Sequence, residues 1–319
     1  MTPSRILLIG GSGFIGSHVA ARLSSQKVQL TIPTRRRERA RHVVLLPMAD
    51  VVETTLATDA ELDGLVSGCT AVINLVGVLH SRWGAPYGPE FAAAHVALPQ
   101  RLVDACRRTG VRRLVHVSAL GVGDDASKLP SMYLRSKADG EQVVRGSGLD
   151  WTVLRPSVVF GPDDRFLNVF ARLMRLAPVM PVARAETRFQ PIYVGDVAQA
   201  ILNVLARGET FGKTYELAGP EVFTLGELVR LVGRWSGCER PVWALPYTLG
   251  QLQASILEHM PGTPLMSRDN FDSMAIDNVA SGPIATELGV DPTPLGAVAP
   301  SYLLRAPARY GVERMRARR

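Results

Sequence analysis

The first apolar run of the chain, residues 6–9, contains four consecutive aliphatic residues, which predicts a short strand buried on both faces. Glycines follow at positions 10, 11, 13 and 16, and residues 18–23 then show the pattern of a helix. Backbone N–H groups and the dipole of a helix N-terminus attract anions, and glycine lets a phosphate approach the backbone closely. The order of strand, Gly-rich turn and helix therefore predicts a site for the pyrophosphate of a dinucleotide.

The alternation of buried strands and helices continues along most of the chain. We expect strands at residues 28–32, 48–51, 71–79, 111–118, 151–157 and 213–217, and helices at residues 59–66, 91–109 and 131–141. Strands that alternate with helices form parallel sheets with helices on both faces. The predicted fold is an α/β Rossmann-type doubly wound parallel sheet, formed by residues 1–160 with further core elements at 186–219. Residues 161–185 and 220–319 are expected to form a smaller C-terminal α+β region that faces substrate or partners.

The later part of the chain carries helix-start signals. Thr224 and Glu227 form the pattern of a capping box before a helix that extends to Trp235, and Ser267 begins another capped helix. We expect Asp196 to be the N-cap of the helix that follows it rather than a catalytic group.

Four large apolar residues recur at helical spacing in the C-terminal region and form one stripe, namely Leu249, Leu252, Ile256 and Met260. We expect this stripe to pack within the C-terminal region, with a docking surface for a partner or a membrane as the alternative. The Arg-rich tail at residues 309–319 is expected to be solvated, with contact to anionic lipid or an acidic partner as its alternative.

Composition narrows the class of protein. Apolar residues make up 46% of the 319 residues, and no apolar run approaches the ~20 residues that span a bilayer. Because the chain enters its first strand almost at once, we expect no signal peptide and a cytoplasmic location. The net charge of +7 comes mostly from Arg, and no basic–aromatic pattern supports nucleic-acid binding.

Cys69, Cys106 and Cys238 lack metal-site spacing, so we expect free thiols and no metal.

Two arginines, Arg35 and Arg36, follow the second predicted strand, and no acidic residue occurs there before Glu38. In doubly wound folds an acid at this place binds the 2′-hydroxyl of NAD, whereas arginine accommodates the 2′-phosphate of NADP. We therefore expect NADP(H) rather than NAD(H), with both arginines as phosphate ligands. A solvated charge run is the alternative.

Ser118, Tyr133 and Lys137 form a candidate catalytic set. Ser118 ends a predicted strand, and ligands gather at the carboxyl ends of parallel strands. Tyr133 and Lys137 are four residues apart, so both side chains project from the same face of a helix. We expect the Lys137 ammonium to lower the pKa of the Tyr133 phenol from about 10, and Ser118 to orient the substrate oxygen. Lys137 can also reach the nicotinamide ribose, whereas His95 is expected to be a packed, hydrogen-bonded histidine.

The spacing Gly10-x-x-Gly13-x-x-Gly16 and the Tyr-x-x-x-Lys pair resemble those of extended and atypical short-chain dehydrogenases/reductases. This resemblance implies that the nucleotide lies along the ends of the first six strands. Asp50 and Val51 are expected to end the third strand beside the adenine, and residues 156–158 to lie beside the nicotinamide. The cofactor-binding residues expected in all are Gly10, Gly13, Phe14, Ile15, Gly16, Arg35, Arg36, Asp50, Val51, Val76, Gly77, Val78, Tyr133, Lys137, Pro156, Ser157 and Val158.

A narrower similarity is carried by residues 133–141, 155–168 and 266–274, which are similar to the NADPH-binding accessory subunit family of respiratory complex I and its bacterial relatives. That family holds the nucleotide as a structural cofactor, and related members are linked to ubiquinone biosynthesis. The complete Ser–Tyr–Lys set favours an NADP(H)-dependent oxidoreductase for a carbonyl, alcohol or quinone-type small molecule. The alternative is a noncatalytic accessory or assembly protein, peripheral on the inner face of the membrane. The sequence leaves this choice and the oligomeric state open.

Overall fold

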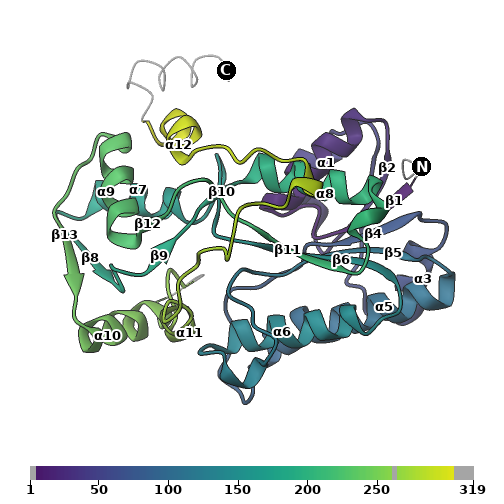
Figure 1. Cartoon of the computed structure of the whole chain (residues 1–319), viewed down its shortest axis with the longest axis horizontal. Helices are drawn as coiled ribbons and strands as arrows, with labels where there is room; N and C mark the ends of the chain where they lie inside the picture. Colours follow the sequence, from purple (N-terminus) through teal and green to yellow (C-terminus); the bar gives the residue numbers. More distant parts are fainter. Residues whose placement is uncertain (1–4, 261–263, 305–319) are drawn as a thin grey trace.

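The computed structural model describes residues 5–260 and 264–304 and contains a seven-stranded sheet (Figure 1). The strand order is β11-β6-β5-β4-β1-β2-β3, and every pair in it is parallel. The predicted Rossmann-type α/β fold is therefore confirmed. The strands are β1 (Arg5–Ile9), β2 (Gln29–Thr34), β3 (Ala49–Glu53), β4 (Ala71–Asn74), β5 (Arg113–Val117), β6 (Asp150–Pro156) and β11 (Lys213–Leu217).

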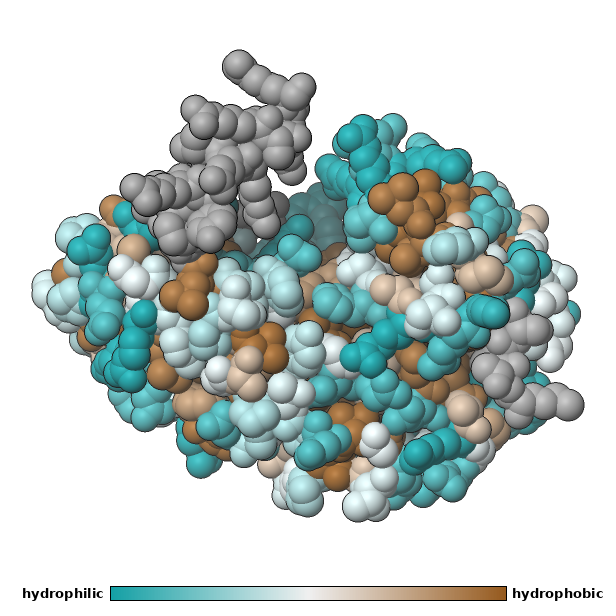
Figure 2. Space-filling model, turned by 90° about the horizontal axis from the view of Figure 1, so that it is seen from above, coloured by the Kyte–Doolittle hydropathy of each residue, from teal (hydrophilic) through white to brown (hydrophobic). Residues whose placement is uncertain are grey.

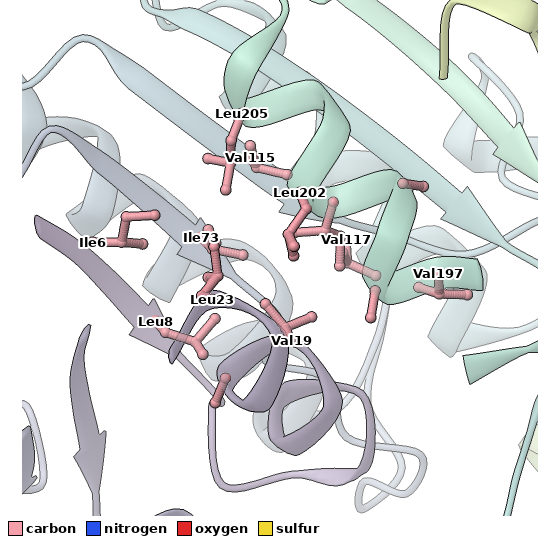
Figure 3. Packing of buried hydrophobic residues seen from close by; sticks show 14 of the residues in the cluster. Ile6, Leu8, Val19, Leu23, Ile73, Val115, Val117, Val197, Leu202 and Leu205 are labelled. Atoms are coloured by element: carbon pink, nitrogen blue, oxygen red, sulfur yellow. The ribbon is translucent and has the colours of Figure 1, made fainter. Parts of the chain in front are cut away.

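One face of the sheet is covered by a pair of long helices and one short helix. Val19 of the first helix packs against Leu8 of β1 in a buried apolar cluster, to which the second long helix contributes Val197 and Leu202 (Figure 3). The core on this face of the sheet thus includes residues of α8, which lie well beyond residue 160 in the sequence. The helices are α1 (Phe14–Ser25), α2 (Arg41–Val44) and α8 (Val194–Ala206).

The opposite face is covered by helices that come between β3 and β6. Leu62, Leu102 and Val144 from three of these helices are fully buried against Leu7 and Val72 of the sheet. A π-helical segment, Ala92–Ala97, joins two of the helices into one run, so the helix predicted from residue 91 begins two residues earlier. The helices are α3 (Asp59–Val66), α4 (Pro89–Phe91), α5 (Leu98–Thr109) and α6 (Met132–Arg145).

Strand β4 ends at Asn74, five residues before the predicted end at residue 79. The Asn74 side chain is buried and accepts a hydrogen bond from the Val76 N–H (3.1 Å). Its amide nitrogen lies 3.1 Å from Nδ1 of His116 on β5. This local turn takes the chain out of the sheet, so residues 75–79 form a loop at the carboxyl edge.

The C-terminal region surrounds a second apolar cluster, in which Phe160, Met174 and Leu228 are fully buried. Capping boxes start two of its helices, at Thr224 and at Ser267, and confirm both predicted starts. Its strands pair in twos, and β8, β9, β12 and β13 lie on the left in Figure 1. The elements are β7 (Val159–Phe160), β8 (Met180–Ala183), β9 (Arg188–Phe189), β10 (Ile192–Tyr193), β12 (Phe223–Thr224), β13 (Val242–Leu245), α7 (Leu167–Leu176), α9 (Leu225–Ser236), α10 (Tyr247–Glu258), α11 (Arg268–Ser273) and α12 (Leu295–Leu303).

Asp196 is not the N-cap of α8, and that prediction is wrong. The helix begins at Val194, so Asp196 lies within its first turn and the cap position belongs to Tyr193. The Asp196 carboxylate accepts hydrogen bonds from the N–H (2.7 Å) and the hydroxyl (3.1 Å) of Thr293. It therefore fastens a C-terminal segment to the helix, while its charge still complements the helix dipole.

Helix α10 buries its small residues and exposes its large ones. Gly250 and Ala254 are buried, and a Cβ on Gly250 would lie only 2.8 Å from the Phe271 ring. The predicted packing of the apolar stripe is therefore wrong, because close approach of the helix requires small side chains on its inner face. The stripe residues are 49–59% exposed, namely Leu249, Leu252, Ile256 and Met260.

On the molecular face seen in Figure 2, apolar side chains form small separate groups among hydrophilic ones. None of the helices in residues 5–260 and 264–304 combines the length and the hydrophobicity needed to cross a bilayer. Cys69, Cys106 and Cys238 are free thiols. The basic tail at residues 309–319 lies outside the described residues.

Candidate functional site

The Gly-rich turn brings α1 into close contact with the end of β1. Gly10 has a φ of +82°, and a Cβ on Gly16 would lie 2.6 Å from the Gly11 Cα and collide with the Gly10 carbonyl oxygen. Helix α1 starts after Gly13 with no side-chain cap and no acidic residue in its first turn. The first-turn amides of Phe14 and Ile15 lack partners within the helix, so this end is suited to an anion such as a pyrophosphate.

Arg35 and Arg36 follow β2 directly, at the carboxyl edge of the sheet. Both side chains are exposed, and no ion pair engages either of them within the described ranges. Their neighbour Arg37 begins a 3₁₀ turn and donates its N–H to the Glu53 carboxylate (3.2 Å). The two guanidinium groups are therefore available to an anionic ligand at the place that the sequence predicts.

Asp50 and Val51 do not end the third strand, and their predicted position at the carboxyl edge is wrong. Strand β3 starts at Ala49 and continues to Glu53, with Asp50 paired to Thr31 in the middle of β2. The residues that follow the strand include Leu56, which has a φ of 56° and donates its N–H to the Thr54 hydroxyl (3.0 Å). The segment beyond Glu53 is thus the one beside the predicted nucleotide path.

The loop after β4 is held beside the helix that carries the Tyr–Lys pair. A Cβ on Gly77 would lie 3.4 Å from Nζ of Lys137, and Val78 donates its N–H to Nε2 of His95 (3.0 Å). Nδ1 of His95 is 2.8 Å from the Ser136 hydroxyl, which donates to the Tyr133 carbonyl. Burial, aided by Lys137, lowers the pKa of His95 to about 2, so the ring is neutral. His95 is a packed, hydrogen-bonded residue, as expected.

Lys137 contacts the end of β5 directly before Ser118. Nζ of Lys137 donates to the carbonyl of Val117 (3.2 Å), the residue directly before Ser118. Ser118 is 5% exposed, and its Oγ is buried without a hydrogen-bond partner among the described residues. An unsatisfied buried hydroxyl is costly, so this atom is suited to bind a ligand oxygen. Tyr133 lies one helical turn before Lys137 on α6.

The pKa of the Tyr133 phenol is shifted in the opposite direction to the one predicted from the sequence. Burial, reinforced by the negative charge of Asp269, raises the pKa of the phenol to about 12, so the predicted lowering by Lys137 is not found. The Tyr133 ring lies edge-on to His95 and Phe91, with centroids 5.5 and 5.9 Å away. This apolar and aromatic wall favours the neutral phenol, which can donate a proton.

Lys137 is 4% exposed, and burial lowers its pKa to about 8, against the raising effect of Glu141 one turn further along α6. Glu141 is itself buried and bonds to the Arg155 guanidinium of β6 through contacts of 2.9 and 2.7 Å. This ion pair fastens α6 to the sheet. Lys137 is therefore mostly protonated at neutral pH, with a pKa only slightly above it, and its side chain lies between α6 and the end of β5.

The end of β6 is fixed by a residue that sequence reasoning missed. Pro156 ends the strand and accepts the Leu120 N–H (2.9 Å). Asn278 Oδ1 then accepts hydrogen bonds from the Ser157 hydroxyl (2.7 Å) and the Val158 N–H (2.8 Å). The only sequence signal for this contact was the similarity of the nearby residues 266–274.

The sheet, the Gly-rich turn and the Tyr–Lys helix together define a nucleotide-binding class of protein, and comparisons with known proteins identify it. Residues 6–218 match the model of the NAD dependent epimerase/dehydratase family, and the chain belongs to this family. Its members share the fold of extended short-chain dehydrogenases/reductases.

Among individual proteins, the chain is similar to subunit 9 of the NADH dehydrogenase (ubiquinone) 1 alpha subcomplex from mouse mitochondria. The identity is 32%, over 90% of this chain and 76% of that protein. Two solved structures share the fold. One is a double mutant of DesIV, a dTDP-glucose 4,6-dehydratase from Streptomyces venezuelae with NAD bound, with a TM-score of 0.72 and 21% identity over 94% of this chain and 95% of that chain. The other is UDP-glucuronic acid 4-epimerase from Bacillus cereus with NAD, with a TM-score of 0.69 and 18% identity over 94% of this chain and 98% of that chain.

The low pKa of Lys137 has a consequence for stability. Between pH 8 and 10.5 the unfolded chain holds the Lys137 proton more tightly than the folded protein does, so the free energy of unfolding should rise with pH, by up to about 3 kcal/mol. Lys137→Met should lose this rise, whereas Lys128→Met, at an exposed lysine, should keep it. Urea unfolding at pH 7, 8.5 and 10 measures the free energy of unfolding of wild type and of both variants. A difference between wild type and Lys137→Met that stays constant with pH would contradict the assignment.

Proposed function

We propose that this protein is an NADP(H)-dependent oxidoreductase that reduces a carbonyl or quinone-type small molecule. The observation that carries this proposal is the buried Oγ of Ser118, which has no partner in residues 5–260 and 264–304 and lies beside the Lys137 contact at the end of β5. A purely structural serine at this place would be expected to satisfy its hydroxyl within the protein. The orphan hydroxyl instead supports a role in holding a substrate oxygen.

The proposed binding of the nucleotide rests on the fit of the Gly-rich turn to a pyrophosphate. The α1 N-terminus and the glycine positions leave room for a pyrophosphate, and Arg35 and Arg36 supply positive charge where a 2′-phosphate would lie. The segment after Glu53 would take the adenine, and Gly77 and Lys137 the nicotinamide ribose. When bound, NADPH supplies a hydride to the carbonyl carbon.

Proton transfer in this proposal belongs to Tyr133. Its phenol, with a pKa of about 12, holds the proton at neutral pH and donates it to the carbonyl oxygen as the carbon is reduced. Ser118 Oγ donates a hydrogen bond to the same oxygen. The ammonium of Lys137 binds the ribose hydroxyls of the nucleotide.

The preference for NADPH can be tested at the two arginines. The double change Arg35→Ser and Arg36→Ser should weaken NADPH binding about tenfold or more, since each tenfold loss is about 1.4 kcal/mol, while NADH affinity stays constant. Calorimetric titration measures both affinities. A matched double change at Arg37 and Arg39 should have little effect. Equal affinity of the wild type for NADPH and NADH would refute the preference.

The catalytic role can be tested by Tyr133→Phe. With NADPH and a water-soluble benzoquinone, the variant should lose at least about 100-fold in kcat/KM, since general-acid catalysis contributes at least this factor, while NADPH binding is retained. Tyr215→Phe, at a tyrosine within β11, should keep activity. Unchanged turnover in Tyr133→Phe would exclude the mechanism. Tight NADPH binding by the wild type without turnover of any quinone, ketone or aldehyde would favour the second candidate function.

That second candidate is a noncatalytic NADPH-binding accessory protein of a respiratory complex. It is supported by the similarity to complex I subunits and by the exposed stripe of α10, at the lower left of Figure 1. Solvent-facing leucine and isoleucine on one helix face are typical of a contact surface. In this function the nucleotide stabilises the fold by binding only the native state.

Charge on the α10 stripe tests this function. In the native membrane fraction, Leu252→Glu combined with Ile256→Glu should reduce retention of the protein about tenfold, because burial of a carboxylate in an apolar interface is costly. Thr248→Glu with Gln251→Glu adds the same charge at other exposed positions of α10 and should preserve retention. If wild-type protein is recovered entirely outside the membrane fraction and without a partner, the accessory function is wrong.

A further inference from the structure

A short C-terminal segment, residues 267–278, lies across the carboxyl edge of the sheet, and we name it the strap. It begins with α11 and ends at Asn278. Asn270 in α11 donates its side-chain amide to the Leu79 carbonyl (3.3 Å), in the loop after β4. Phe271 in the middle of α11 is 1% exposed and stacks under the Arg184 guanidinium (4.6 Å). The strap is thus a packed element of the C-terminal region that contacts the loop after β4 of the seven-stranded sheet.

One end of the strap caps the helix that carries Tyr133 and Lys137. The Asp269 carboxylate, 7% exposed, accepts hydrogen bonds from the N–H groups of Met132 (2.6 Å) and Tyr133 (3.1 Å). These are the first two residues of α6. The helix cap Ser131 receives a further hydrogen bond from the Ser273 hydroxyl (2.8 Å). A carboxylate at a helix N-terminus gains both charge-assisted hydrogen bonds and the helix dipole.

The other end of the strap holds the end of β6. Asn278 binds Ser157 and Val158, the pair expected beside the nicotinamide, and its backbone N–H donates to the Arg188 carbonyl (2.8 Å). Both ends therefore act on the nicotinamide half of the site. Among the described contacts of the strap, none involves the Gly-rich turn or residues 35–36, which form the adenosine half.

We propose that Asp269 is a positioning residue for the nicotinamide half of the site, which it controls by holding the first turn of α6 against the strap. This inference rests on the proposed NADP(H) binding. Lys137 lies less than two turns from the capped residues, so a shift of the helix start moves the group that would grip the nicotinamide ribose. The charge of Asp269 also raises the pKa of Tyr133 and so helps to keep its phenol protonated. The adenosine half should be insensitive to Asp269.

The test compares two ligands on the full chain by calorimetric titration: NADPH, which spans both halves, and 2′,5′-ADP, which occupies only the adenosine half. Asp269→Ala should weaken NADPH binding about tenfold and leave 2′,5′-ADP binding within twofold. Asp269→Asn keeps one acceptor oxygen and should lie between the alanine variant and the wild type. Asp277→Asn removes an exposed carboxylate from the same strap and should alter neither affinity.

Equal weakening of both ligands in Asp269→Ala would show a general loss of structure, and unchanged NADPH binding would show no role; either result overturns the inference. If Asp269→Ala does not fold, Asn278→Ala releases the other end of the strap and should give the same selective loss. Wild-type protein that binds neither ligand refutes the proposed function itself. Wild-type binding without a selective effect of either variant refutes only the role of the strap.

Discussion

The close approach of α1 to the end of β1 is the constraint on which the rest of the site depends. Because Gly16 has no side chain, the helix lies against Gly10 and Gly11, and its uncapped N-terminus faces the carboxyl edge. Strand β1 lies between β2 and β4, where the chain reverses its direction of winding. At such a switch point the helices on the two faces diverge and leave a crevice for a ligand. The geometry of one turn thus fixes where a dinucleotide can lie.

The two halves of the proposed nucleotide site are built differently. The adenosine half is mostly local, since the turn, β2 and Arg35–Arg36 lie within about thirty residues of chain and the segment after Glu53 follows the next strand, β3. The nicotinamide half is assembled from distant segments: the β4 loop, Ser118, α6, the β6 end and the strap. Its charged members are held by burial and pairing, as the Glu141–Arg155 ion pair shows. A half built from long-range contacts is the part that a C-terminal region can adjust while the contacts of the adenosine half are kept.

The sequence predicts the local half better than the distant one. The Gly-rich turn, the strand–helix alternation and two capping boxes are local patterns, and the structure contains all of them. Strand ends are harder to predict: β3 is an edge strand with Asp50 near its start, so the sequence predicts the strand end at Asp50 and Val51 instead of at Glu53. The Tyr–Lys pair is predicted from its spacing, but the pKa of Tyr133 depends on burial and on Asp269, which is 136 residues away.

Helical periodicity shows which residues share a face and does not show what covers that face. The stripe of α10 illustrates this, because the apolar face points outward and Gly250 and Ala254 allow the inner face to pack closely. Contacts of this kind, like those of Asp269 and Asn278, follow only from the assembled fold. The combination of a candidate nucleotide site and an exposed apolar helix explains why both proposed functions, an enzyme and an accessory protein, fit the chain.

Calorimetric titration of nucleotide-stripped protein with NADPH tests the central claim most directly, in wild type, Gly16→Val and Gly64→Val. Gly64 is also helical, but a Cβ there would meet no atom within 4 Å. We predict that wild type and Gly64→Val bind NADPH. Gly16→Val should give no measurable heat, although its circular dichroism spectrum stays native. Absence of binding by the wild type to NADPH and NADH, or undiminished binding by Gly16→Val, would contradict it.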